Sequence, residues 1–321
     1  MLVDDIWDYK SLNMGRELSI AGEFVYDSAR KAMSLHGLNN NYEINAILYS
    51  GAVGIERLQK VFLCLATPNP ADGSMVPECL KKHNHSDLEN HIKVYSKKEL
   101  PVNGRSLLGL FNEYYNRYRY GNYVPGNSDK KLRELFISFL KKINRKFDFD
   151  EPCATVQFEP FKQFYINEIG KTAKHYYDLI DEKAREINTY TYELDSNSNA
   201  ARVFWSTHRR TLYQQLNLEQ EAVKELLLHL YKNHGECGVF KLLNEMQPLE
   251  FDDALVNDYL TDLCEGKVND SLIDLIDDLH EEIENKEDRK ERHELLSLIG
   301  NMSVFFDFED EEEEHESDPR E

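Results

Sequence analysis

Apolar residues recur along most of the chain at steps of three and four positions, the spacing that places them on one face of an α-helix. The first stripe runs from Leu18 to Leu35 and stops at Gly37. The second runs from Ile44 to Leu65 and stops at a proline-rich segment, which cannot continue a helix. Further helices are predicted near residues 105–120, 128–146, 160–194, 200–216, 218–233, 252–265, 270–284 and 287–300. No alternating pattern is long enough for a β-sheet, so the sequence predicts an all-α fold.

The segment FDFDEPCATVQFEP, residues 147–160, interrupts the helical pattern and could hold a short strand. We place a domain boundary there. The sequence thus predicts a bundle of four to five helices over residues 1–150, followed by an acidic helical domain over residues 151–306. Residues 307–321 cannot bury an apolar face and repel one another, so they are predicted to be a disordered acidic tail.

Charge divides the chain unevenly, although the formal net charge of the whole is −21. Residues 1–150 sum to +3 and residues 151–321 to −24, while residues 91–147 alone reach +9. A basic segment can meet phosphate, whereas the acidic half repels nucleic acid. The tail, at −9, provides solubility, competes for the basic patch or holds a basic partner.

The chain has the features of a cytoplasmic protein. No apolar run approaches the roughly twenty residues that a membrane-spanning helix needs, so no membrane partner is predicted. The first residues, MLVDDIWDYK, are acidic where an export signal is basic and then apolar. The five cysteines are odd in number and contain no Cys-x-x-Cys, which indicates reduced thiols.

Two glycines interrupt the second stripe. Gly51 and Gly54 lie three residues apart on one helix face, and each costs up to about 1 kcal/mol relative to alanine. Close approach of another backbone usually offsets such a cost, so we predict helix packing or a dimer seam there. On the same helix, Glu56 and Lys60 are four residues apart and can form an ion pair.

The segment KKHNHSDLENH, residues 81–91, places His83, His85 and His91 near Cys79 and Asp87. Zinc could use four such groups, but their spacing matches no common zinc signature, so neither a metal nor a cofactor is predicted. The alternative is that a helix starts here with its histidines on the surface, and that His85 donates a hydrogen bond to the bundle.

The segment FNEYYNRYRYGNYVPG, residues 111–126, interleaves tyrosines with arginines. Such tyrosines can fill a bundle core. Alternatively, the rings stack on bases and the guanidinium groups contact phosphate. We predict Arg117 and Arg119 as ligand-facing residues of an RNA or nucleotide site in the basic segment 91–147. The remaining predicted members of this site are Tyr120, Lys130, Lys131 and Arg133.

Over roughly residues 15–147, the chain resembles the HEPN (higher eukaryotes and prokaryotes nucleotide-binding) helical domain. The resemblance rests on GIERLQK, on HSDLENH and on NRYRYGNY, in that order. The residues that match the family's motifs are Glu56, Arg57, Lys60, His85 and Asp87. It implies a helical bundle, commonly dimeric, and a setting in bacterial antiviral defence or toxin–antitoxin systems.

Many members of this family are RNases whose active arginine is followed by a histidine four to six residues later. Two pairs here have that spacing, Arg30 with His36 and Arg202 with His208, which is no more than chance predicts. Our leading hypothesis is therefore a non-catalytic module that recognises RNA, a nucleotide or a protein partner. One alternative is a metal-independent RNase that uses Arg202 and His208. The other is a structural subunit whose acidic helices bind a basic partner.

Overall fold

The computed structural model describes residues 3–68, 78–123, 129–143, 155–205, 208–232, 238–251, 253–283, 285–301 and 304. Every regular element in these ranges is a helix, which confirms the predicted all-α fold. Of the helices in the same ranges, none has the length and apolar character needed to cross a membrane. The predicted tail, residues 307–321, lies outside the described residues.

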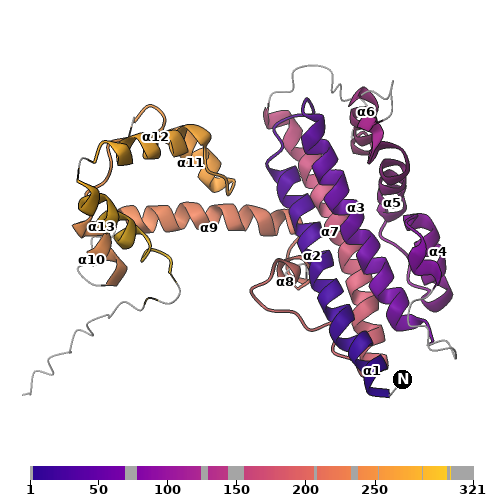
Figure 1. The fold of residues 1–321 in the computed structure, drawn as a ribbon. Helices are drawn as coiled ribbons and strands as arrows, with labels where there is room; N and C mark the ends of the chain where they lie inside the picture. Colours follow the sequence, from indigo (N-terminus) through magenta and orange to yellow (C-terminus); the bar gives the residue numbers. More distant parts are fainter. Residues whose placement is uncertain are drawn as a thin grey trace, which may run out of the picture. The chain divides into compact units, whose positions relative to one another are not determined.

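Three long helices form the centre of the first part of the chain: α2 (Met14–Met33), α3 (Asn41–Ala66) and α7 (Thr155–Glu186). Each of them packs against the other two (Figure 1). A short helix, α1 (Val3–Asp8), leads through a π-helical turn, η1 (Tyr9–Asn13), into α2. Because α2 and α3 carry the two apolar stripes of the sequence, the periodicity alone identifies both.

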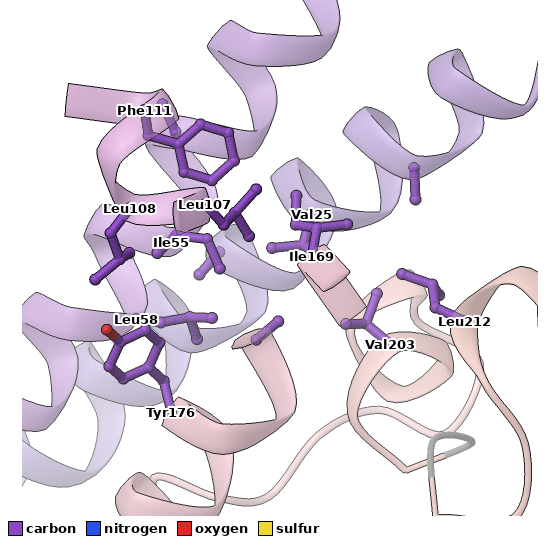
Figure 2. Packing of buried hydrophobic residues seen from close by; sticks show 14 of the residues in the cluster. Val25, Ile55, Leu58, Leu107, Leu108, Phe111, Ile169, Tyr176, Val203 and Leu212 are labelled. Atoms are coloured by element: carbon purple, nitrogen blue, oxygen red, sulfur yellow. The ribbon is translucent and has the colours of Figure 1, made fainter. Parts of the chain in front are cut away.

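The first compact unit extends beyond the boundary predicted at residue 150. The chain divides between Asn217 and Leu218. Ile169 and Tyr176 of α7 lie in the same hydrophobic core as Ile55 of α3 (Figure 2). The apolar face of α7 is thus covered by the first helices of the chain, which is why the structure does not divide at residue 150. Of the predicted strand, residues 155–160 begin α7 and the remainder lies outside the described residues.

Three shorter helices cover α3. They are α4 (His85–Tyr95), α5 (Gly104–Glu113) and α6 (Asp129–Leu140), and a short 3₁₀ turn, η2 (Glu78–Lys81), precedes α4. The Oδ1 atom of Asn84 accepts hydrogen bonds from the first backbone N–H groups of α4, at 3.0 Å each, and so caps that helix. After α5 the chain continues as a π-helical turn, η3 (Tyr114–Tyr118), and a 3₁₀ turn, η4 (Gly121–Tyr123).

The two glycines of α3 lie at close helix contacts within the chain. A Cβ atom on Gly54 would stand 2.8 Å from Val25 Cγ2 and 3.0 Å from Val25 N. One on Gly51 would stand 2.9 Å from Phe111 Cζ and from the Tyr165 hydroxyl oxygen. Intrachain helix packing therefore accounts for both glycines, and no dimer seam is needed to explain them.

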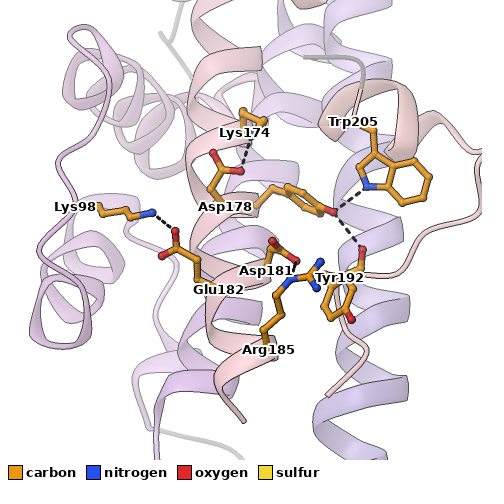
Figure 3. A network of polar contacts seen from close by, with 9 residues as sticks. Lys98, Lys174, Asp178, Asp181, Glu182, Arg185, Tyr192 and Trp205 are labelled. Atoms are coloured by element: carbon orange, nitrogen blue, oxygen red, sulfur yellow. Dashed lines mark hydrogen bonds and ion pairs between the residues drawn. The ribbon is translucent and has the colours of Figure 1, made fainter. Parts of the chain in front are cut away.

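A polar network connects the chain that follows α7 to that helix (Figure 3). The Trp205 indole donates to the Tyr177 hydroxyl at 2.8 Å, and this hydroxyl donates to the Tyr192 carbonyl at 3.2 Å. The Arg185 guanidinium lies 4.0 Å from the centre of the Tyr192 ring. The short helix α8 (Asn199–Phe204) lies in this stretch and packs on both α2 and α7. The helix predicted over residues 200–216 is thus divided, because α8 ends at Phe204.

The second unit differs from the first in burial and in charge. Its helix α9 (Leu212–Lys232) begins in the first unit; the others are α10 (Gly238–Glu245), α11 (Val256–Cys264), α12 (Asp270–Glu281) and α13 (Lys286–Leu296). Among its described residues only Leu242 is buried. Residues 1–217 sum to +2 and residues 218–321 to −23, so the acidic character predicted from residue 151 belongs to the second unit.

Candidate functional site

Residues from the three motifs of the sequence analysis meet beside α3, where the chain enters α4 and leaves α5. Arg119 lies among three tyrosine rings, with its guanidinium carbon 4.4 Å from the ring centre of Tyr115, 5.0 Å from that of Tyr120 and 5.5 Å from that of Tyr49. These four residues are called the arginine–tyrosine cluster. Tyr49 comes from α3 and the others from the turns after α5, which pack against α3.

Arg119 carries a positive charge, as arginine side chains in proteins always do. Burial lowers the pKa of its guanidinium, but the oxygens of Tyr115, Tyr120 and Tyr49, with a hydrogen bond to Tyr49, raise it above the ordinary value. Within the part of the chain that the structure describes, no carboxylate forms an ion pair with Arg119. Its neighbours are therefore neutral aromatic rings rather than an acid, which leaves its charge able to bind an anion.

A second group of side chains adjoins this cluster. Glu56 is buried, and its Oε1 atom accepts hydrogen bonds from Lys60 Nζ at 2.7 Å and from His83 Nδ1 at 3.0 Å. The His83 ring stacks on Tyr115 with 5.7 Å between ring centres, which joins the two groups. Burial, and then the charge of Glu56, raise the pKa of Tyr115, so its hydroxyl stays protonated. Both motif residues Glu56 and Lys60 thus belong to one polar site.

This arrangement suits a ligand that carries both phosphate and an aromatic base. Arg119 offers planar N–H donors to phosphate. Tyr120 and Tyr123 expose 61% and 85% of their surface, with 6.4 Å between their ring centres, and offer faces on which bases can stack. His83 donates from Nδ1 to Glu56, so its Nε2 atom, when the ring is neutral, can accept a hydrogen bond from a ribose hydroxyl.

His85 lies in the core and not on the surface. Its ring donates from Nε2 to the Ala52 carbonyl at 2.9 Å, so the hydrogen bond to the bundle that the sequence predicted is present. Its backbone N–H donates to Asn112 Oδ1 at 2.7 Å, and its carbonyl accepts from Gln59 Nε2 at 2.9 Å. This histidine holds the start of α4 against α3 and positions the adjacent site without facing a ligand.

Stability should fall on mild acidification because His85 is buried as a neutral ring. Burial lowers its pKa, an effect that the Ala52 carbonyl and the charge of Glu56 only partly oppose. The contribution of the neutral ring to folding stability is complete above the unfolded pKa of about 6.5 and is lost as the pH falls through the lower folded pKa. The loss amounts to about 1.4 kcal/mol for each pH unit by which the folded pKa lies below the unfolded one. In urea titrations at pH 7.5 and 5.5, wild type should lose more stability than His85→Phe. An equal loss in both proteins would contradict this origin.

Other predicted residues lie elsewhere or are already paired. Arg57 points from α3 toward α2, where it pairs with Glu17 and covers the Phe24 ring, so it does not join the cluster. Asp87 is exposed in the first turn of α4. Arg117 is exposed and forms an ion pair with Glu113 at 2.8 Å, and a neighbouring carboxylate therefore offsets its charge.

The predicted lysines belong to α6, which contacts the turn η3 beside the cluster. Lys130 and Lys131 are exposed, and Lys130 lies 3.9 Å from Glu134. Arg133 is partly buried on the same helix. These side chains form the basic surroundings of the cluster rather than its centre.

The residues considered for metal binding and for RNase catalysis do not come together at this site. Within the described ranges, no group of three or more histidine, cysteine, aspartate or glutamate side chains could hold a metal ion. Arg202 donates to Asn199 Oδ1 at 3.0 Å and lies over the Tyr26 ring. His208 lies exposed beyond the end of α8.

Neither a functional role for Tyr49 nor a partner for His83 was predicted from the sequence. The position of Tyr49 could have been predicted. It precedes Glu56 by seven residues, which is two helical turns, so the two residues lie on the same face of α3. For His83 the sequence holds no such pattern, since it lies outside a helix and meets Glu56 only through the fold. In comparisons with known proteins, no family model, no curated protein and no solved structure matches this chain, and the resemblance to HEPN domains therefore stays a prediction.

Proposed function

We propose that this chain is a non-catalytic module that binds single-stranded RNA or its nucleotides at the arginine–tyrosine cluster. The observation that carries the proposal is the setting of Arg119, a charged guanidinium among three tyrosine rings and without a carboxylate partner in the described residues. Arg57, another partly buried arginine of the same unit, is instead paired with a carboxylate, that of Glu17. The antiviral or toxin–antitoxin setting stays a prediction from the resemblance.

The surroundings favour nucleic acid over a simple anion. Exposed tyrosine faces add nothing to the binding of inorganic phosphate, whereas stacking on an aromatic ring contributes about 1–3 kcal/mol per base. Tyr120 and Tyr123 supply such faces beside the guanidinium. A duplex hides its base faces, so these rings favour a single strand.

The test is a fluorescence-anisotropy titration of the full chain with a labelled single-stranded RNA of eight nucleotides at low salt. Arg119→Ala should weaken binding about tenfold or more, the equivalent of about 1.4 kcal/mol. The matched control is Arg105→Ala, which removes the same charge from an exposed residue of α5 that pairs with Glu99. Equal binding by both variants, or no binding by wild type, would refute the proposal.

Base stacking can be separated from charge at Tyr120, which exposes most of its ring. Tyr120→Phe keeps the ring and should bind RNA nearly as wild type does. Tyr120→Ala should bind it at least fivefold more weakly, because about 1 kcal/mol or more of stacking is lost. The same two variants should not differ in their response to inorganic phosphate. An equal loss of RNA binding in both variants would show that the hydroxyl, and not the ring, makes the contact.

A further inference from the structure

The helices of the second unit leave much apolar surface exposed. Among the described residues of this unit, only Leu242 is buried. Several large apolar side chains expose two fifths or more of their surface, among them Leu228, Tyr231, Leu260, Leu263, Val268 and Ile273. Patches of this kind on a folded chain usually mark a surface that another molecule covers.

Part of this surface forms a groove between α9 and α11, with a volume of about 680 Å³. Leu228 and Tyr231 line it from α9, and Leu260 and Cys264 line it from α11. Polar residues also line it, among them Lys224 and Glu265. The Glu265 side chain is largely buried, and its carboxylate pairs with Lys267 at 2.9 Å. The groove thus combines apolar side chains from both helices with polar ones, and it includes two charged residues, Lys224 and Glu265.

Charge decides what can occupy the groove. Exposed acids flank the lining residues on α9, at Glu221 and Glu225, and Asp258 does so on α11. The unit as a whole sums to −23. A second copy of this unit would bring the same charge to the contact and be repelled, whereas a cationic partner would be attracted and steered toward it.

We propose that the groove between α9 and α11 is the docking site for a basic amphipathic helix of a partner protein. Apolar side chains at helical spacing would enter the groove beside Leu228 and Leu260, as in other helix-in-groove complexes. Lysine or arginine residues on the remaining faces would meet the acids that flank it. The site is independent of the arginine–tyrosine cluster, because every lining residue belongs to the second unit.

The test uses the full chain and a synthetic helical peptide of about 20 residues, with leucines at positions i, i+3, i+4 and i+7 and lysines elsewhere. A second peptide has the same composition, shuffled so that the leucines no longer share a face. Isothermal titration calorimetry near 150 mM salt should show at least tenfold tighter binding of the amphipathic peptide. Equal binding of both peptides would reveal charge attraction alone and overturn the proposal.

Three variants locate the binding. Leu228→Asp should lower the affinity for the amphipathic peptide at least tenfold, whereas Leu226→Asp should change that affinity less than twofold. Both residues are exposed leucines of α9, but Leu226 does not line the groove, so the variants match in helix and in charge. Cys264→Phe fills the groove without adding charge and should also weaken binding. Equal effects of the two aspartates, or a dimer in light scattering that Leu228→Asp dissociates, would rule out this occupant.

Discussion

Gly54→Ala should destabilise the first unit, although alanine is the better helix former. The added Cβ atom would meet Val25 N at 3.0 Å and the Ala21 carbonyl oxygen at 3.1 Å, and both are backbone atoms of α2. Backbone atoms cannot move away by a change of rotamer as a side chain can, so α2 and α3 must separate where they are in contact. We expect the free energy of unfolding to fall by about 2 kcal/mol, because the cost of the steric clash exceeds the roughly 1 kcal/mol by which alanine stabilises a helix relative to glycine.

The matched control is Gly109→Ala in the middle of α5. Gly109 is exposed, and no atom lies within 4 Å of the position its Cβ would take. The same substitution should therefore stabilise the protein, by up to about 1 kcal/mol. Urea titrations followed by far-ultraviolet circular dichroism would compare the two. A loss at both positions, or at neither, would contradict the close contact of α2 with α3.

The helices with the clearest apolar stripes could be predicted from the sequence because their period depends only on local spacing. The stripe from Leu18 to Leu35 became α2, and that from Ile44 to Leu65 became α3. The close backbone approach expected at the two glycines was found at Gly54, which meets backbone atoms of α2, whereas Gly51 meets side chains, among them Phe111 and Tyr165. Such features can be predicted without knowing which residues far apart in the sequence contact each other.

The domain boundary depended on long-range packing and could not be predicted. The segment over residues 147–160 was predicted to interrupt the helical pattern, and it ends at Pro160, which lacks a backbone N–H donor. In the structure α7 continues through Pro160, and Phe158 and Phe161 beside it are almost wholly buried in the shared core. Packing of these rings outweighs one lost hydrogen bond. Conversely, the helix predicted over residues 200–216 is divided in the structure, where α8 ends at Phe204 and α9 begins at Leu212.

The candidate site was predictable in its parts but not in its connections. Arg119 and Tyr120 were expected to face a ligand, and they lie in the arginine–tyrosine cluster. The pairing of Glu56 with His83 joins residues 27 positions apart in sequence, which no local pattern records. Arg117 shared the motif of Arg119 but pairs with Glu113, because the two are four residues apart along one turn.

A buried hydrogen-bond network beside the site leads to the second large effect. The Tyr176 hydroxyl donates to Glu89 Oε2 at 2.8 Å and accepts from Gln59 Nε2 at 2.9 Å. Burial raises the pKa of Glu89, and the bond from Tyr176 opposes that rise. Burial also raises the pKa of Tyr176 well above its ordinary value, so its hydroxyl keeps the proton that it donates. The tyrosine thus stabilises a carboxylate that water cannot reach well.

Tyr176→Phe should lower the free energy of unfolding by about 2 kcal/mol at pH 8, because a buried carboxylate loses its donor. The loss should be smaller at pH 5. Because the pKa of Glu89 is higher in the folded than in the unfolded protein, its contribution to stability is complete below the unfolded pKa of about 4.5 and is lost as the pH rises through the folded pKa. Tyr176→Phe raises the folded pKa of Glu89 further, so the variant loses more stability at high pH than the wild type does. In a Glu89→Gln background the same substitution should cost less at pH 8 and lose its pH dependence. A cost that is equal at both pH values and in both backgrounds would mean that the hydroxyl acts through packing, and that the charge of Glu89 has no part in the network.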